Sequence, residues 1–170
     1  TSDTIAITVG SVPIAAIKSP TQGLIFRGAD VISYSGSGTD AEDGNLPASA
    51  YSWTVMFHHD DHIHPFLGPV IGVTSGQFTI LVTGHDFRGT TTFEIILTVR
   101  DSNGNQTSTS VFILPDKVSI TWFSQPTGLN LIIDGITILA PRVYDTLIGF
   151  VHSLEAADQT FGGSLYVFGS

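Results

Sequence analysis

The sequence predicts an all-β protein, and three observations indicate this class. Short runs rich in β-branched and aromatic residues recur along the chain, separated by Gly, Pro, Asn or Asp. No long stretch keeps the 3.6-residue period of a helix. In Ser49–Phe57, the residues Tyr51, Trp53, Val55 and Phe57 instead recur with a period of two, which places them on one face of a strand. These features favour a β-sandwich or barrel.

The predicted strands form two groups, on either side of Pro115-Asp116. The first group is Ile5–Val9, Ala15–Ile17, Asp30–Ser35, Ser49–Phe57, Gln77–Val82, Thr91–Arg100 and Thr107–Leu114. The second group is Val118–Phe123, Leu129–Ile133, Arg142–Thr146, His152–Ala156 and Ser164–Phe168. Proline ends a strand and a charged pair opens the next segment, so the boundary is expected here. We expect a sandwich over residues 11–115 and a small β-domain over 116–170, with 1–10 as a linker or the last strand of a preceding domain.

The composition excludes two classes of partner. Charged residues make up only 12% of the chain, about half the usual share of a soluble domain. The net charge is −9, and Lys and Arg form no run. Because nucleic acids and anionic membrane surfaces require clustered basic side chains, the sequence argues against both. The chain has no cysteine, so it has neither a disulfide nor a thiolate site.

The same composition indicates where the protein works. Low charge, many Ser, Thr, Asn and Gly residues and the absence of cysteine are typical of secreted bacterial β-proteins. No apolar stretch approaches the roughly 20 residues of a membrane span, and no signal peptide is present. We expect an extracellular location without membrane insertion, and a chain excised from a longer array of domains.

Several motifs in residues 13–114 occur in the order found in one family of extracellular sandwiches. They are Ala16-Ile17-Lys18-Ser19-Pro20, Ser35–Gly44, Tyr51-Ser52-Trp53 and Leu97–Gly104. Through these motifs, residues 13–114 resemble a polycystic-kidney-disease-type (PKD-like) Ig sandwich. The variant is similar to the modules appended to secreted bacterial sugar dehydrogenases and carbohydrate-active enzymes. The resemblance implies calcium binding through Asp40 and Asp101 and nearby backbone. The chain departs from the family by inserting His58–Pro65 where a short turn is usual.

The second predicted domain is similar to a PEGA-like small β-domain. The matching residues are Pro126–Leu129, Ile133-Asp134-Gly135, Ala140-Pro141, Gly149, His152 and Tyr166-Val167-Phe168. The chain stops where a Trp-rich continuation is expected, so the domain is expected to be truncated. At the position that matches the family, His152 is expected to pack inside this unit.

A cluster of oxygen-bearing side chains predicts a calcium site. In an Ig-like sandwich the loops after the second and sixth strands lie at the same end. Here these loops carry Asp40, Glu42 and Asp43, and Asp101 and Asn103, respectively. Calcium binds six to eight such oxygens. The alternative is that Asp43-Gly44 and the Asn103 turn are only turn chemistry without a metal.

Four of the six histidines lie in residues 58–64, at the opposite end of the predicted sandwich. The loop that carries His85 is expected to reach the same end. If the chain stays extended, His58, Asp60, His62 and His64 share one face and form a possible zinc or copper site. The alternatives are a structural loop network, with histidines stacked on aromatic rings, or a sugar site.

The remaining chemistry favours a protein that is not an enzyme. No Gly-x-Ser-x-Gly elbow and no phosphate loop occur. Trp53 is expected in the core. The aromatic residues expected at the surface are Tyr34, Phe66, Phe87, Phe123 and Tyr144, and of these Phe66, Phe87 and Tyr144 are candidates for ligand binding.

The leading hypothesis is a calcium-stabilised, non-catalytic accessory module that binds carbohydrate or spaces an enzyme from its polysaccharide. Its partners would then be a polysaccharide or other domains of a larger secreted protein. One alternative is a structural or adhesive repeat, or a filament subunit, that assembles by donating Ile5–Val9 to a neighbour. Another is a metal-dependent activity at the histidine loop.

Overall fold

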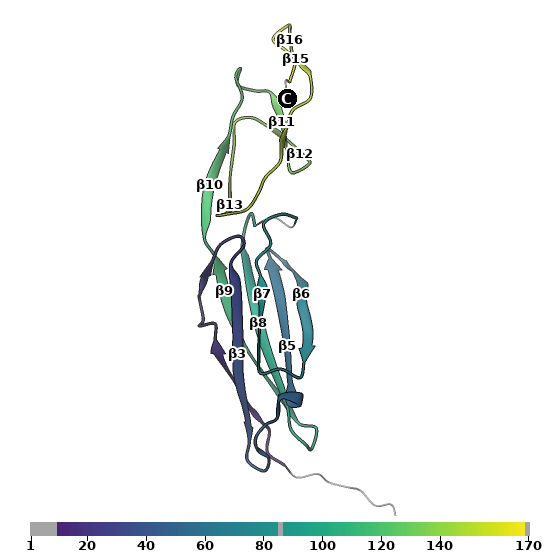
Figure 1. Cartoon of the computed structure of the whole chain (residues 1–170). Coiled ribbons are helices and arrows are strands. Elements are labelled where there is room, and N and C mark those ends of the chain that lie inside the picture. The colour runs from purple at the N-terminus through teal and green to yellow at the C-terminus, as the bar shows by residue number, and fades with distance from the viewer. Residues whose placement is uncertain (1–9, 85–86, 169–170) are drawn as a thin grey trace, which may run out of the picture. The chain divides into compact units, whose positions relative to one another are not determined.

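A computed structural model describes residues 10–84 and 87–168 and confirms the all-β class (Figure 1). Apart from one turn of 3-10 helix at Ala48–Ala50, the regular elements of these residues are strands. No described segment is a helix of the length and hydropathy needed to cross a membrane. The predicted strand Ile5–Val9 lies outside the described residues.

The chain divides into two compact units. The first comprises the chain up to Phe26 together with Asp30–Ile80 and Thr90–Leu114. The second comprises the chain from Pro115 onward, and it also includes Arg27–Ala29 and Leu81–Gly89. These two early segments join it through backbone hydrogen bonds, from Gly28 N–H to the Ile148 carbonyl (2.8 Å) and from Val151 N–H to the Val82 carbonyl (2.7 Å). Such long-range pairs leave no signal in the local sequence pattern.

The first unit contains two antiparallel sheets. In one sheet, β3 pairs with each of the other three strands; the members are β1 (Ile14–Ser19), β3 (Val31–Asp40), β4 (Gly44–Asn45) and β7 (Ser75–Thr79). The other sheet has the order β2 (Ile25–Phe26), β9 (Gln106–Pro115), β8 (Thr91–Arg100), β5 (Tyr51–His59) and β6 (His62–Ile71).

The core lies where these two sheets face each other. Along β5 and β8 every second side chain is buried, which is the period-two pattern predicted for Ser49–Phe57. Trp53 is fully buried, as predicted, and its ring lies 4.7 Å from that of Tyr34 on β3. Tyr34 is only 3% exposed, so its predicted place at the surface is wrong. Gly36 on β3 lets the two sheets come close together at this point, because a Cβ there would lie only 2.6 Å from Leu97 Cδ2 on β8.

The largest element that the sequence did not predict is β6. Its segment contains Pro65 and Pro69, and proline cannot donate a ladder hydrogen bond, so the sequence argues against a central strand. The structure resolves this conflict because β6 is the edge strand of its sheet. Gly68 has φ 98°, and a Cβ there would lie 2.4 Å from the Trp53 carbonyl, so glycine is required where the pairing register shifts.

The second unit is built from short antiparallel pairs. β10 (Lys117–Trp122) pairs with β13 (Arg142–Leu147). A three-stranded sheet has the order β12 (Ile136–Leu139), β11 (Asn130–Ile133) and β14 (Leu154–Glu155). A hairpin joins β15 (Gln159–Phe161) to β16 (Ser164–Tyr166). The buried apolar residues of the second unit include Leu129, Ile133, Ala140 and Leu147.

Candidate functional site

The acidic side chains gather at one end of the first unit, which we call the acidic pole and define as Ser11, Asp40, Glu42, Asp43, Asp101, Ser102 and Asn105. Tyr51 at the start of β5 pairs with Val99 at the end of β8, so the loop that follows β8 lies at this end. The carboxylate of Asp43 reaches this loop and accepts hydrogen bonds from Ser102 N–H and Ser102 Oγ, both at 2.8 Å. The two loops therefore meet, as predicted.

The segment that enters β1 also joins the acidic pole. Asn105 Nδ2 donates to Asp101 Oδ2 at 2.8 Å and to the Ser11 carbonyl at 3.3 Å. The Ser11 hydroxyl donates to Asp40 Oδ2 at 3.3 Å and also to Glu42 Oε2. Ser11 thus connects the two acidic loops. Sequence reasoning did not find this role for it.

The carboxylates of the acidic pole act as acceptors for local turns. Asp40 Oδ1 accepts hydrogen bonds from the backbone N–H groups of Glu42 (3.0 Å) and Asp43 (3.1 Å). Asp101 Oδ1 accepts from Asn105 N–H at 2.7 Å. The hydrogen bond from the Asp43 backbone is the main cause that lowers the pKa of Asp40, because it stabilises the ionised carboxylate. This is the turn chemistry that the sequence left open as an alternative to calcium.

A preformed metal cage is not present in the part of the chain that the structure describes. No three His, Asp or Glu side chains of residues 10–84 and 87–168 come together so that they could hold a metal ion. The amide of Asn103, the remaining predicted ligand, lies beside Gly10: a Cβ on Gly10 would be 3.0 Å from its Nδ2. Calcium would have to draw Asp40 and Asp101 away from hydrogen bonds that they already accept.

The histidines lie at the other end of the first unit, where His59 pairs with Thr91 at the start of β8. Strands β5 and β6 form a hairpin whose turn is Asp60-Asp61, with His59 paired to His62 and Phe57 paired to His64. Directly paired residues point to the same face of a sheet. The rings agree: the centroids of His59 and His62 are 5.2 Å apart, and those of His62 and His64 are 4.8 Å apart.

The predicted grouping of His58 and Asp60 with His62 and His64 on one face is wrong. The reversal at the turn shifts the alternation, so His58 lies on the opposite face from His59. There His58 Nε2 is 2.9 Å from Glu94 Oε2. His59, which the prediction left out, is the true neighbour of His62. The predicted site residue His85 lies outside the described residues.

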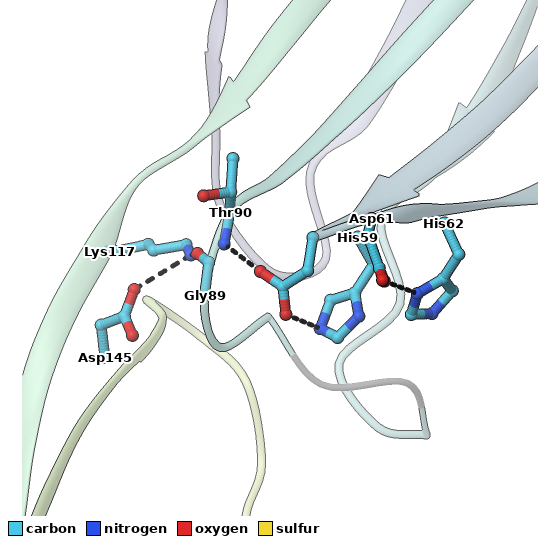
Figure 2. A network of polar contacts seen from close by, with 8 residues as sticks. His59, Asp61, His62, Gly89, Thr90, Lys117 and Asp145 are labelled. Carbon is cyan, nitrogen blue, oxygen red and sulfur yellow. Dashed lines mark hydrogen bonds and ion pairs between the residues drawn. The ribbon is translucent and has the colours of Figure 1, made fainter.

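The turn is fixed by its two aspartates, of which Figure 2 labels Asp61, beside His62. Asp60 has φ 49°, its N–H donates to the Thr90 carbonyl (2.8 Å), and its Oδ1 accepts from Thr90 N–H (2.8 Å). Asp61 Oδ1 lies 3.1 Å from His62 Nδ1, and this hydrogen bond is the main cause that lowers the pKa of Asp61. His59 Nε2 lies 4.0 Å from Asp60 Oδ2. The contacts thus match the structural loop network that the sequence offered as an alternative.

Of the three aromatic residues predicted to bind ligand, Phe87 is buried, whereas Phe66 and Tyr144 are half-buried. Phe87 is 2% exposed and contacts Phe150 at a centroid distance of 5.8 Å. The ring of Phe66 packs on Phe93 at 4.8 Å. Phe87 is therefore closed to a ligand, whereas Phe66 keeps part of its surface exposed. Tyr144 on β13 keeps part of its surface in solvent, and the guanidinium of Arg88 lies 5.1 Å from its ring centroid.

His152 packs inside the second unit, as predicted, but the polar contacts of its ring were not predicted. His152 Nδ1 lies 2.6 Å from Asp134 Oδ2, and His152 Nε2 lies 2.8 Å from Thr146 Oγ1. The order hydroxyl, imidazole, carboxylate is that of a nucleophilic triad. However, Thr146 is 2% exposed, so its hydroxyl is closed to substrate. The rings of Trp122 and Phe150 pack on His152. The row of contacts from Thr146 through His152 to Asp134 is therefore part of the core of this unit.

No family model, curated protein or solved structure matches this chain. The resemblance of its units to PKD-like and PEGA-like domains therefore stays a prediction from the motifs quoted above.

Proposed function

We propose that this chain is a non-catalytic accessory segment of a secreted protein, which binds carbohydrate and so holds a partner domain near its polysaccharide. One observation carries the proposal: Tyr144, one of the three aromatic residues predicted to bind ligand, is partly exposed and lies on the wall of a pocket in the second unit. A flat aromatic ring packs on the apolar face of a sugar ring and leaves the hydroxyl groups to polar neighbours.

The polar clusters support a non-catalytic role. Hydrogen bonds join the loops of the acidic pole, the aspartates of the histidine hairpin hold its turn, and the Thr146 hydroxyl is buried. The Thr146 hydroxyl, which is hydrogen-bonded to the His152 imidazole as covalent catalysis would require, is buried and therefore closed to a substrate. A spacer function needs only the two units themselves.

Calcium belongs to the proposal as a stabilising ion. Four carboxylates, those of Asp40, Glu42, Asp43 and Asp101, lie at the acidic pole, and none forms an ion pair with a described residue. A divalent cation would offset their mutual repulsion. Because Asp40 and Asp101 already accept hydrogen bonds, we expect the weak affinity of extracellular modules, a dissociation constant of roughly 10⁻⁴–10⁻³ M.

Affinity gel electrophoresis tests the carbohydrate proposal. The protein is run in gels that contain neutral or acidic polysaccharides, and we expect retardation in at least one class. Tyr144→Ala should abolish it. Phe123→Ala is the matched control, because it removes a 73% exposed aromatic side chain from the same unit without touching the pocket. Unchanged mobility of the unmodified protein across all classes would overturn the binding function.

A second candidate is a transition-metal ion at the histidine hairpin. The observation that favours it is that His59, His62 and His64 occupy one face, with neighbouring rings about 5 Å apart. The side chains would have to rotate before their nitrogens could converge. Elemental analysis of the purified protein decides: stoichiometric zinc or copper that His62→Ala removes would support this candidate, and a metal-free protein that does not take up added zinc would exclude it.

A further inference from the structure

Two of the chain's six basic residues, Arg88 and Arg142, line the same pocket of the second unit. The pocket has a volume of about 380 Å³, and its other lining residues are Ile136, Thr137, Ile138, Leu139 and Tyr144. We propose that this pocket binds the carboxylate of a uronic acid unit in an acidic polysaccharide. The inference rests on the proposed carbohydrate-binding function and names the class of sugar.

The strand register places one arginine and the aromatic ring side by side. Arg142 and Tyr144 lie two residues apart on β13, so their side chains emerge on the same face. Their partners on β10 are Trp122 and Ile120, which cover the neighbouring part of that face. Arg142 is exposed and forms no ion pair with any residue of the described ranges. Its charge is therefore available to a ligand.

The second arginine arrives from a segment far away in the sequence. Arg88 lies near the end of Leu81–Gly89, the segment that joins the second unit, and its guanidinium is 5.1 Å from the centroid of the Tyr144 ring. This cation–π contact limits the orientations of the guanidinium, so little freedom is lost when a ligand binds. The two guanidinium groups and the ring thus border one hollow.

This combination fits a charged sugar better than a neutral one. A guanidinium donates two parallel hydrogen bonds to a carboxylate, and a pair with charge on both partners is stronger than a neutral hydrogen bond. The pocket volume is within the range of small-molecule sites, about 300–1,000 Å³. Apolar side chains of β12, including Ile136 and Leu139 (48% and 63% exposed), offer a surface for the C–H groups of the sugar ring.

The overall charge makes the proposal specific. With a net charge of −9 the protein as a whole repels a polyanion. Retention by a polyuronate therefore requires a local site that overcomes this repulsion. A protein with a positive net charge could be retained by a polyanion through that charge alone. This explanation does not apply to a protein with a net charge of −9.

The test compares gels that contain polygalacturonate, carboxyl-reduced polygalacturonate, a neutral glucan or dextran sulfate, without added calcium so that the ion cannot bridge carboxylates. We expect retardation in polygalacturonate and loss of that retardation when its carboxyl groups are reduced. Arg142→Gln should weaken the apparent affinity about tenfold or more, and Arg142→Lys should recover only part of it. Lys18→Gln, which removes one positive charge from the first unit, should change nothing.

The outcomes separate this inference from the function on which it rests. Retardation in the neutral glucan alone overturns the uronate assignment and leaves carbohydrate binding intact. No retardation in any gel overturns both. Retention by dextran sulfate alone overturns the choice of carboxylate over sulfate. Equal mobility of Arg142→Gln and the unmodified protein, or an equal loss in Lys18→Gln, overturns the pocket as the site.

Discussion

The carboxylate of Asp43, in the loop after β3, accepts two hydrogen bonds from Ser102 in the loop after β8, one from the backbone N–H and one from the hydroxyl, each 2.8 Å long. The residues are 59 positions apart. Their contact joins loops that follow strands of different sheets, so it holds one end of the sandwich together through hydrogen bonds. The two sheets are thus connected by this polar contact between their loops as well as by the apolar core between them.

Removing the Ser102 hydroxyl should destabilise the first unit by a modest amount. Ser102→Ala keeps the backbone donor, so we expect the free energy of unfolding to fall by about 0.5–1.5 kcal/mol. Asp43→Ala removes the shared acceptor and should have the larger effect. Urea unfolding measures both, with Ser75→Ala as a control for an exposed serine at the start of β7. If Asp43→Ala has no effect, the contact does not form in solution.

The pH dependence of stability should depend on Asp40. Hydrogen bonds from Asp43 and Glu42 lower its pKa in the folded protein, so the unfolded chain takes up this proton more readily as the pH falls. The stabilisation is fully present above the unfolded pKa of about 3.9 and is lost as the pH drops through the lower folded value. Asp40→Asn keeps an oxygen acceptor but cannot ionise, and its stability should change less with pH below about 4. Identical slopes of unfolding free energy against pH in both proteins would contradict this.

Calcium should raise the melting temperature only at millimolar concentration. At micromolar calcium the expected weak site is empty, and a ligand stabilises the native state only when its concentration exceeds the dissociation constant. Scanning calorimetry at increasing calcium concentration, with EDTA as the reference, measures the effect. Asp101→Asn should abolish the rise. Magnesium is the control for general screening of the acidic pole, and an equal rise with magnesium would argue against a calcium site.

The sequence predicted what local patterns encode. β8 was predicted at Thr91–Arg100 and has these bounds, because its period-two pattern is continuous and lies between turns. The prediction failed where pairing or long-range packing decides. Strand β6 was missed because it contains two prolines, and the chain reversal at Asp60-Asp61 places His58 on the other face. The carboxylate that contacts His152 belongs to Asp134, which lies 18 residues away in the sequence. The Ile133-Asp134-Gly135 turn was recognised as a motif, but only the fold shows that its carboxylate meets an imidazole.

The His152 chain gives the last prediction. His152→Ala should destabilise the second unit by about 3 kcal/mol or more, because it opens a cavity among aromatic rings and leaves the buried Thr146 hydroxyl without its partner. Asp134→Asn should cost less, since it keeps an oxygen near Nδ1.

Each unit contains one tryptophan, so the effect of His152→Ala can be followed in each unit separately. Trp53 Nε1 donates to the Val73 carbonyl at 3.0 Å in the first unit, whereas Trp122 contacts His152 in the second. In NMR spectra of His152→Ala, the indole N–H signal of Trp122 should shift or collapse while that of Trp53 stays in place. His62→Ala, in the first unit, is the control and should leave the Trp122 signal unchanged. If both indole signals move together in His152→Ala, the two units do not respond independently and His152 has a role beyond the core of its own unit.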